Sequence, residues 1–187
     1  MINLEEVFID NPIIAAARDE NGLQKAIESD CAIVFLLYGN IITITELCQR
    51  LKAAEKIVFI HIDLIDGLKG DPSSIEYIKK YVNPDGIITT KGANIKYARN
   101  QGLLTIQRIF IIDSHSLTTG IKGINDTCPS AVEVMPGIAS KIIKQLQKNV
   151  KIPIIAGGLI SSKEDIMEGL ASGAVAISTT RDELWQL

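Results

Sequence analysis

The stretches IPIIAGG at residues 152–158 and AVAISTT at residues 174–180 decide the fold class of this chain. Each is a short apolar run that ends in small residues, and a helical segment separates them. Strands that are apolar on both faces are typical of parallel sheets covered by helices. In (β/α)8 barrels, the loops after the last two strands and a short extra helix often build a phosphate site. We therefore interpret residues 152–180 as the last two units of such a barrel.

The ends of these two strands are predicted to bind a phosphate group. After the first strand, two glycines lack a Cβ, so a ligand can approach their backbone N–H groups closely. After the second strand, hydroxyl residues lead into a predicted short helix at 181–185, whose N-terminus carries free N–H donors and partial positive charge. The glycine pair alone is also explained by close packing, and only the combination indicates phosphate. The predicted phosphate site consists of Gly157, Gly158, Ser178, Thr179 and Thr180.

The rest of the chain repeats the same alternation of apolar runs and amphipathic segments. Eight strand–helix units in 187 residues average about 23 residues each, which is short for barrels of ~250 residues but sufficient. A doubly wound open sheet gives the same alternation; the paired phosphate loops favour the barrel. We expect a (β/α)8 TIM-barrel-like single domain over residues 1–187. The expected strands are 13–17, 32–38, 56–65, 86–90, 103–112, 131–135, 152–158 and 174–180.

Composition restricts the classes of protein that fit. The chain is 47% hydrophobic and 22% charged, and no apolar run reaches the ~18 residues of a membrane span. The first residues lack the basic and apolar blocks of a signal peptide, so we expect a cytoplasmic location. A net charge of −3 argues against a generally basic nucleic-acid surface, although it leaves room for a local basic face. Three scattered cysteines indicate reduced thiols, and we expect no metal site and no cofactor.

Charged side chains at the ends of the predicted strands are candidates for contacts with a polyol. In a parallel barrel, these ends surround one opening. Carboxylates accept hydrogen bonds from hydroxyl groups, and cations neutralise an anion, so the opening suits a small polyol phosphate. The same spacing also fits a structural ion pair of Arg108 with Glu133 or Asp63, and His61 fits a hydrogen-bonded core histidine. The candidate polyol-binding residues are Asp63, Lys91, Arg108, Glu133 and Arg18.

A lysine stripe is a weak candidate for RNA contacts. The side chains at i, i+3, i+7 and i+10 of a predicted helix share one outward face. Such faces are usually only solvated, and no aromatic residue that could stack on RNA bases is interleaved. The stripe consists of Lys141, Lys144, Lys148 and Lys151.

Eight sequence blocks in the same order resemble the glycerol uptake operon antiterminator family over nearly the whole chain. Two positions differ from the family pattern, Met135 in place of Leu and Ser130 in place of a common Asp. No RNA-contact motif carries over. The blocks are PIIAAAR (12–18), FLLYGN (35–40), HIDLIDG (61–67), DGIITTK (85–91), GLLTIQRIFIIDS (102–114), VEVMPG (132–137), IAGGLI (155–160) and the Ser-Thr-Thr run at 178–180 with Leu184 and Trp185.

The resemblance implies a barrel fold and a regulator, with no catalytic residues. Its implied effector is sn-glycerol 3-phosphate, and its implied partner is leader mRNA, where binding prevents transcription termination upstream of glycerol-utilisation genes. A homo-oligomer is also possible, and no membrane partner is expected. We take the irregular segment Ser114–Pro129 as the candidate switch element.

Two other functions remain open from the residues alone. One is a TIM-barrel enzyme, an aldolase or isomerase that acts on a small triose or polyol phosphate. Lys91 would serve it as a Schiff-base amine or Glu133 as a base. The other is a metabolite-binding barrel without an RNA role. Fold by itself does not decide among these functions.

Overall fold

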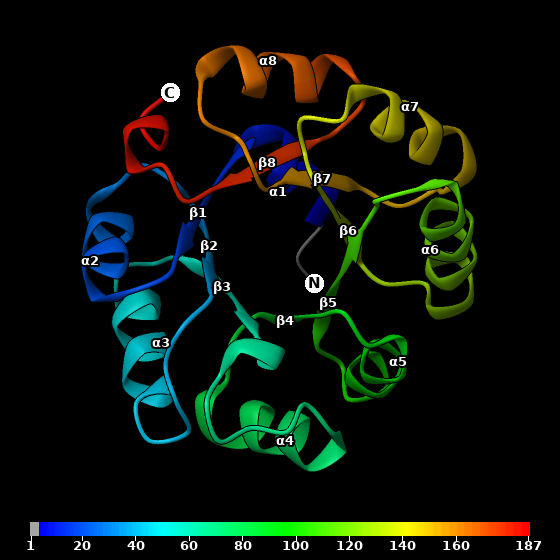
Figure 1. The fold of residues 1–187 in the computed structure, drawn as a ribbon. Helices are drawn as coiled ribbons and strands as arrows, with labels where there is room; N and C mark the ends of the chain where they lie inside the picture. The colour runs from blue at the N-terminus through cyan, green and yellow to red at the C-terminus, as the bar shows by residue number, and fades with distance from the viewer. Residues whose placement is uncertain (1–3) are drawn as a thin grey trace.

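The computed structural model describes residues 4–187, which form a closed barrel of eight parallel strands surrounded by helices (Figure 1). The strands pair in sequence order, and β8 returns to β1 with Ile13 opposite Ile177. This closure confirms the barrel and excludes the open sheet. The strands are β1 (Ile13–Ala17), β2 (Ile33–Leu36), β3 (Ile57–His61), β4 (Gly86–Thr89), β5 (Leu104–Phe110), β6 (Ala131–Met135), β7 (Ile154–Gly157) and β8 (Ala176–Thr179).

Helices follow the strands and form the outer ring of the molecule. Their apolar side chains and the outward side chains of the strands form one core layer. The helices are α1 (Leu4–Asp10), α2 (Glu20–Glu28), α3 (Ile44–Ala53), α4 (Pro72–Tyr77), α5 (Gly92–Asn100), α6 (Ser114–Thr127), α7 (Ser140–Asn149) and α8 (Lys163–Ala171), with a π-helical turn at Ile78–Val82 and 3₁₀ turns at Ile62–Leu64 and Asp182–Leu184.

A second core layer fills the barrel itself. Phe35 and Phe59 meet edge to face inside it, with ring centroids 5.9 Å apart. Phe59 leaves no room for a side chain at Gly86, where a Cβ would lie 2.5 Å from the Phe59 ring. A glycine on β4 therefore makes room for the large Phe59 ring on the neighbouring strand β3.

The N-terminal helix α1 was not predicted from the sequence. It precedes β1 and closes the amino-terminal end of the barrel, where Leu4 and the fully buried Phe8 join the inner core. Its seven residues are too few to show helical periodicity clearly, and a helix this short depends on tertiary packing for its stability.

Several predicted elements differ from the structure in their bounds or their regularity. The strand expected at 56–65 ends at His61, because residues 62–64 turn into a 3₁₀ helix. The strand expected at 103–112 spans Leu104–Phe110. The segment expected to be an irregular helix forms the regular 14-residue α6, which begins with a capping box between Asp113 and Ser116. Within residues 4–187, no helix combines the length and apolarity that crossing a membrane requires.

We expect Phe8→Ala to lower the free energy of unfolding by about 3–5 kcal/mol, because it leaves a cavity at the closed end of the barrel. Ile9 is the matched control, since its side chain is 60% exposed and Ile9→Ala should change stability by less than about 0.5 kcal/mol. Urea denaturation of both variants measures the difference. Equal, small losses would show that α1 contributes little to the core.

Candidate functional site

A cavity of about 510 Å³ opens at the carboxyl ends of the barrel strands, beside β1, β6, β7 and β8. It brings together seven of the predicted site residues: Arg18, Arg108, Glu133, Gly158, Ser178, Thr179 and Thr180. Seven residues that the sequence did not single out complete the lining: Ala16, Leu37, Met135, Leu159, Ile160, Ser161 and Arg181.

A buried ion pair forms the floor of this cavity. The Arg108 Nε donates to Glu133 Oε2 at 2.6 Å, and the side chains are 7% and 1% exposed. The Ser178 hydroxyl donates to the other carboxylate oxygen at 2.5 Å. The structure therefore shows the ion pair that the sequence left as one alternative for Arg108. Among residues 4–187, no acceptor contacts the terminal N–H groups of the guanidinium.

Gly157 makes room for the buried carboxylate. A Cβ at this position would lie 2.5 Å from Glu133 Oε1, closer than a real Cβ approaches an oxygen. The glycine itself does not line the cavity. Its role in the geometry is therefore to leave space for Glu133 and Ser178 to meet at the floor of the cavity.

Backbone donors face the opening where β7 and β8 end. Gly158 and Leu159 both have positive φ angles, +77° and +62°, which turn the chain sharply after β7. The N–H groups of Gly158 and Thr180 have no hydrogen-bond partner in the part of the chain that the structure describes. Free backbone N–H groups at a tight turn are suited to bind an anion.

In place of the helix predicted at 181–185, the structure has a three-residue 3₁₀ turn at Asp182–Leu184, so no α-helix begins there. The Thr179 hydroxyl is engaged in the protein, since it donates to the Ile160 carbonyl at 3.2 Å and accepts from the Arg181 N–H at 3.1 Å. Positive charge comes instead from the Arg18 and Arg181 side chains, which form no ion pair with any described acidic residue.

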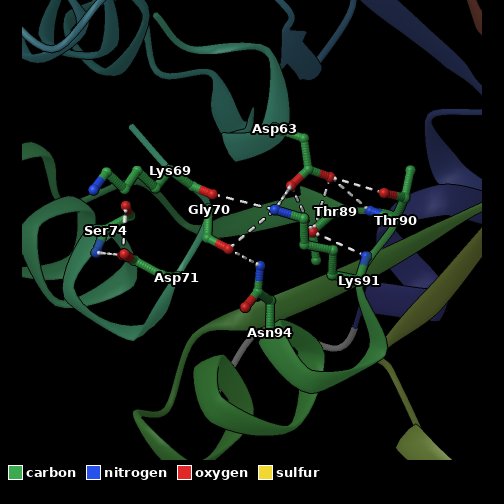
Figure 2. A network of polar contacts seen from close by, with 9 residues as sticks. All are labelled: Asp63, Lys69, Gly70, Asp71, Ser74, Thr89, Thr90, Lys91 and Asn94. Carbon is green, nitrogen blue, oxygen red and sulfur yellow. Dashed lines mark hydrogen bonds and ion pairs between the residues drawn. The ribbon is translucent and has the colours of Figure 1, made fainter. Parts of the chain in front are cut away.

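Asp63 and Lys91 do not line the cavity; they belong to a separate network that fixes the loop after β3 (Figure 2). Asp63 accepts hydrogen bonds from the Thr89 hydroxyl at 2.9 Å and the Thr90 N–H at 2.8 Å. The Lys91 Nζ donates to the Gly70 carbonyl at 3.3 Å. The 3₁₀ turn after β3 directs Asp63 toward β4 rather than along the strand face that the sequence predicted.

His61 is a buried core histidine, but it lacks the hydrogen bond that the sequence analysis expected. Its Nδ1 has no partner among the residues described. Burial, and next the nearby Arg108 charge, lower the pKa of this imidazole to about 4, so the ring is neutral near pH 7. His61 therefore adds no charge beside the Arg108 cation, which Glu133 balances.

The lysine stripe lies away from the cavity, on the outer surface. Lys141, Lys144 and Lys148 are exposed on α7, whereas Lys151 lies two residues beyond the end of that helix. No acidic side chain within residues 4–187 pairs with any of the four. The stripe is an unpaired basic face in an otherwise acidic protein.

Several lining residues that sequence reasoning missed carry a weak signal. Arg181 and Leu159 directly follow predicted site residues, and Met135 is the last residue of the predicted strand 131–135. A rule that includes the first residues of each loop after a strand would have found Leu159, Ser161 and Arg181.

Comparisons with known proteins agree with this architecture. A family model described as glycerol-3-phosphate responsive antiterminator matches residues 13–185. YgcP of Escherichia coli, an uncharacterised protein, is 39% identical over 177 residues, which cover 95% of this chain and 93% of YgcP.

Two solved structures share both fold and sequence with the chain. The glycerol uptake operon antiterminator regulatory protein from Listeria monocytogenes has a TM-score of 0.91 and 35% identity, and the match covers 94% of this chain and 95% of that one. An antiterminator-related protein from Thermotoga maritima has a TM-score of 0.85 and 32% identity, with 95% and 99% of the chains covered.

We expect Glu133→Ala to destabilise the protein by about 3–5 kcal/mol, because it leaves the Arg108 charge buried and unpaired. Replacing both partners with apolar residues, Arg108→Met with Glu133→Leu, removes the unpaired charge and should restore much of the loss. Guanidinium denaturation of the single and double variants tests this coupling. A double variant that is no more stable than Glu133→Ala would contradict it.

Proposed function

Because the chain belongs to the glycerol-3-phosphate responsive antiterminator family, we propose that it binds sn-glycerol 3-phosphate in the 510 Å³ cavity and acts on RNA as a transcription antiterminator. Its proposed target is the leader mRNA of glycerol-utilisation genes. The observation that carries the proposal is the buried Arg108 guanidinium, which Glu133 holds in place while its terminal N–H groups remain available to a ligand.

The cavity has a separate place for each half of the proposed effector. The phosphate lies at the rim, where the N–H groups of Gly158 and Thr180 are free and two arginines, Arg18 and Arg181, supply positive charge. The glycerol hydroxyl groups lie deeper, against Arg108 and its hydrogen-bonded partners. Asp63 and Lys91 have no part in this arrangement, since both are engaged in the loop network.

The geometry supports binding better than catalysis. As a Schiff-base amine, Lys91 would have to face the ligand, but its Nζ donates to carbonyl groups outside the cavity lining. As a base, Glu133 would have to leave two strong hydrogen bonds, from Arg108 and Ser178. A carboxylate held in this way positions an arginine, which is the task of a receptor site.

The proposed regulation requires the effector to bind the RNA-competent state more tightly than the other state. RNA phosphates have a candidate contact surface in the unpaired lysine stripe on α7. Helices α6 and α7 are neighbours in the outer ring (Figure 1), so the candidate switch segment Ser114–Pro129 lies beside the helix that carries this stripe.

Glycerol 3-phosphate at about 100 times its Kd should stabilise the protein by about 2.7 kcal/mol, measured as a thermal shift. Gly158→Asp should abolish this gain, because it places a negative charge at the proposed phosphate position. Gly158→Ala is the matched control, since it introduces the same backbone strain at φ +77° without charge. Loss of the gain in both variants would assign the effect to strain rather than to phosphate binding.

Glycerol 3-phosphate should increase the affinity of the protein for leader RNA, measured by fluorescence anisotropy over a series of salt concentrations. The logarithm of the binding constant should fall linearly with the logarithm of salt concentration. Lys144→Gln with Lys148→Gln should reduce that slope by about 0.7 per lost phosphate contact, whereas the exposed Lys96→Gln on α5 should not. Affinity without effector or salt dependence would overturn the antiterminator proposal.

A further inference from the structure

We propose that a second cavity, between β5 and α6, binds an unpaired base of single-stranded RNA; this inference rests on the proposed function and identifies where the RNA is read. The cavity has a volume of about 490 Å³ and is distinct from the effector cavity. Its walls are mainly apolar, with a few polar groups. The residues that matter for the argument are Gln107, Ile109, Phe110, His115, Gly120 and Gly123.

The Gln107 amide is a polar group with an unused hydrogen-bonding position. Its side chain lies on the outward face of β5 and is 94% buried, since only 6% of the residue surface is exposed. The Thr127 hydroxyl satisfies one amide atom at 2.6 Å. The other amide atom, Nε2, has no partner within residues 4–187 and lies toward the Gly123 side of the cavity. This donor is not among the fully buried polar atoms without a partner, so water reaches it, and a polar edge of a bound molecule can replace that water.

Two glycines of α6, Gly120 and Gly123, border the cavity. Packing within the protein does not require glycine at either position. A Cβ at Gly123 would meet only Gln107 Nε2, at 3.7 Å, and a Cβ at Gly120 would make ordinary contacts of 3.4 and 3.5 Å. Glycine in a helix interior is unfavourable relative to alanine. By contrast, Gly169 on α8 is required, since its Cβ would lie 2.7 Å from Ile177. The space beside Gly120 and Gly123 is therefore available to a ligand.

An aromatic side chain stands at the opening of this cavity. Phe110, the last residue of β5, is 56% exposed, and the exposed His115 lies in the first turn of α6. A flat heteroaromatic ring matches these features, because its face stacks on an aromatic side chain and its polar edge pairs with a buried amide. An aliphatic peptide side chain or a lipid chain would leave the Gln107 amide unpaired.

The position of the cavity also connects it to the effector site and to the basic surface. Arg108 lines both cavities, and its guanidinium faces Glu133 inside the barrel, so the two cavities meet at strand β5 and a ligand that displaces Arg108 acts on a strand that both share. The exposed lysines of α7 lie on the helix next to α6 (Figure 1). An RNA strand that contacts these lysines through its phosphates can place a base beside Phe110.

The test uses the full chain with glycerol 3-phosphate and fluorescein-labelled six-nucleotide RNAs, rA6 and rU6, with an abasic strand of the same length. Phe110→Ala removes the stacking surface, and Gly123→Leu fills the cavity. Ile112→Ala and Thr118→Leu are the matched controls, because both residues are exposed and neither lines the cavity. The thermal shift with glycerol 3-phosphate is measured for each variant to confirm folding and effector binding.

We expect Phe110→Ala and Gly123→Leu to weaken binding of the tighter base-containing RNA by about 10-fold, with no change in the two controls. Binding of the abasic strand should be weak and equal in all proteins. Equal affinity of all variants, or equal binding of abasic and base-containing strands by the original protein, would overturn the inference. If the original protein binds leader RNA but neither hexamer, the inference alone fails; if it binds no RNA with or without effector, the proposed function fails as well.

Discussion

The buried contact between Arg108 and Glu133 constrains how strands β5 to β8 are aligned at the cavity end of the barrel. Burying two charges is costly unless their geometry is good and their other polar atoms are bonded. Both conditions depend on strand register, because Arg108 lies opposite Glu133 in the β5–β6 pairing. Ser178 reaches the same carboxylate from β8, and Gly157 on β7 leaves the space for it. Four consecutive strands must therefore be aligned for this one interaction to form.

The proposed function follows from the terminal N–H groups of Arg108, which its contact with Glu133 leaves available to a ligand. The carboxylate holds the guanidinium through Nε alone, so its terminal donors are directed to a ligand without a further cost of ordering the side chain. The neutral His61 beside it adds no competing charge. Because Arg108 on β5 borders both cavities, the proposed effector site and the proposed base site share this strand. The β3–α4 loop network is fixed independently of both, through Asp63 and Lys91 (Figure 2).

Residues at the ends of apolar strands were predictable as a group, because parallel strands bring their carboxyl ends to one opening. Their individual directions were less predictable. Arg108 and Glu133 lie within regular strands, so alternation of side chains placed both inside the barrel. Asp63 follows the point at which β3 becomes a 3₁₀ turn, and strand alternation does not extend through such a turn. The cavity near Phe110 had no sequence signal, since its glycines resembled helix breaks rather than a binding wall.

The sequence by itself determined the eight-unit barrel, the small-residue loops after β7 and β8, and the family resemblance, because apolar periodicity and turn residues act locally along the chain. Only the tertiary structure decided which charged groups meet. It paired Arg108 with Glu133, separated Lys91 from the cavity, and brought α1 under the barrel so that Phe8 fills its closed end. These outcomes depend on strand register and on contacts between distant segments, which no local pattern encodes.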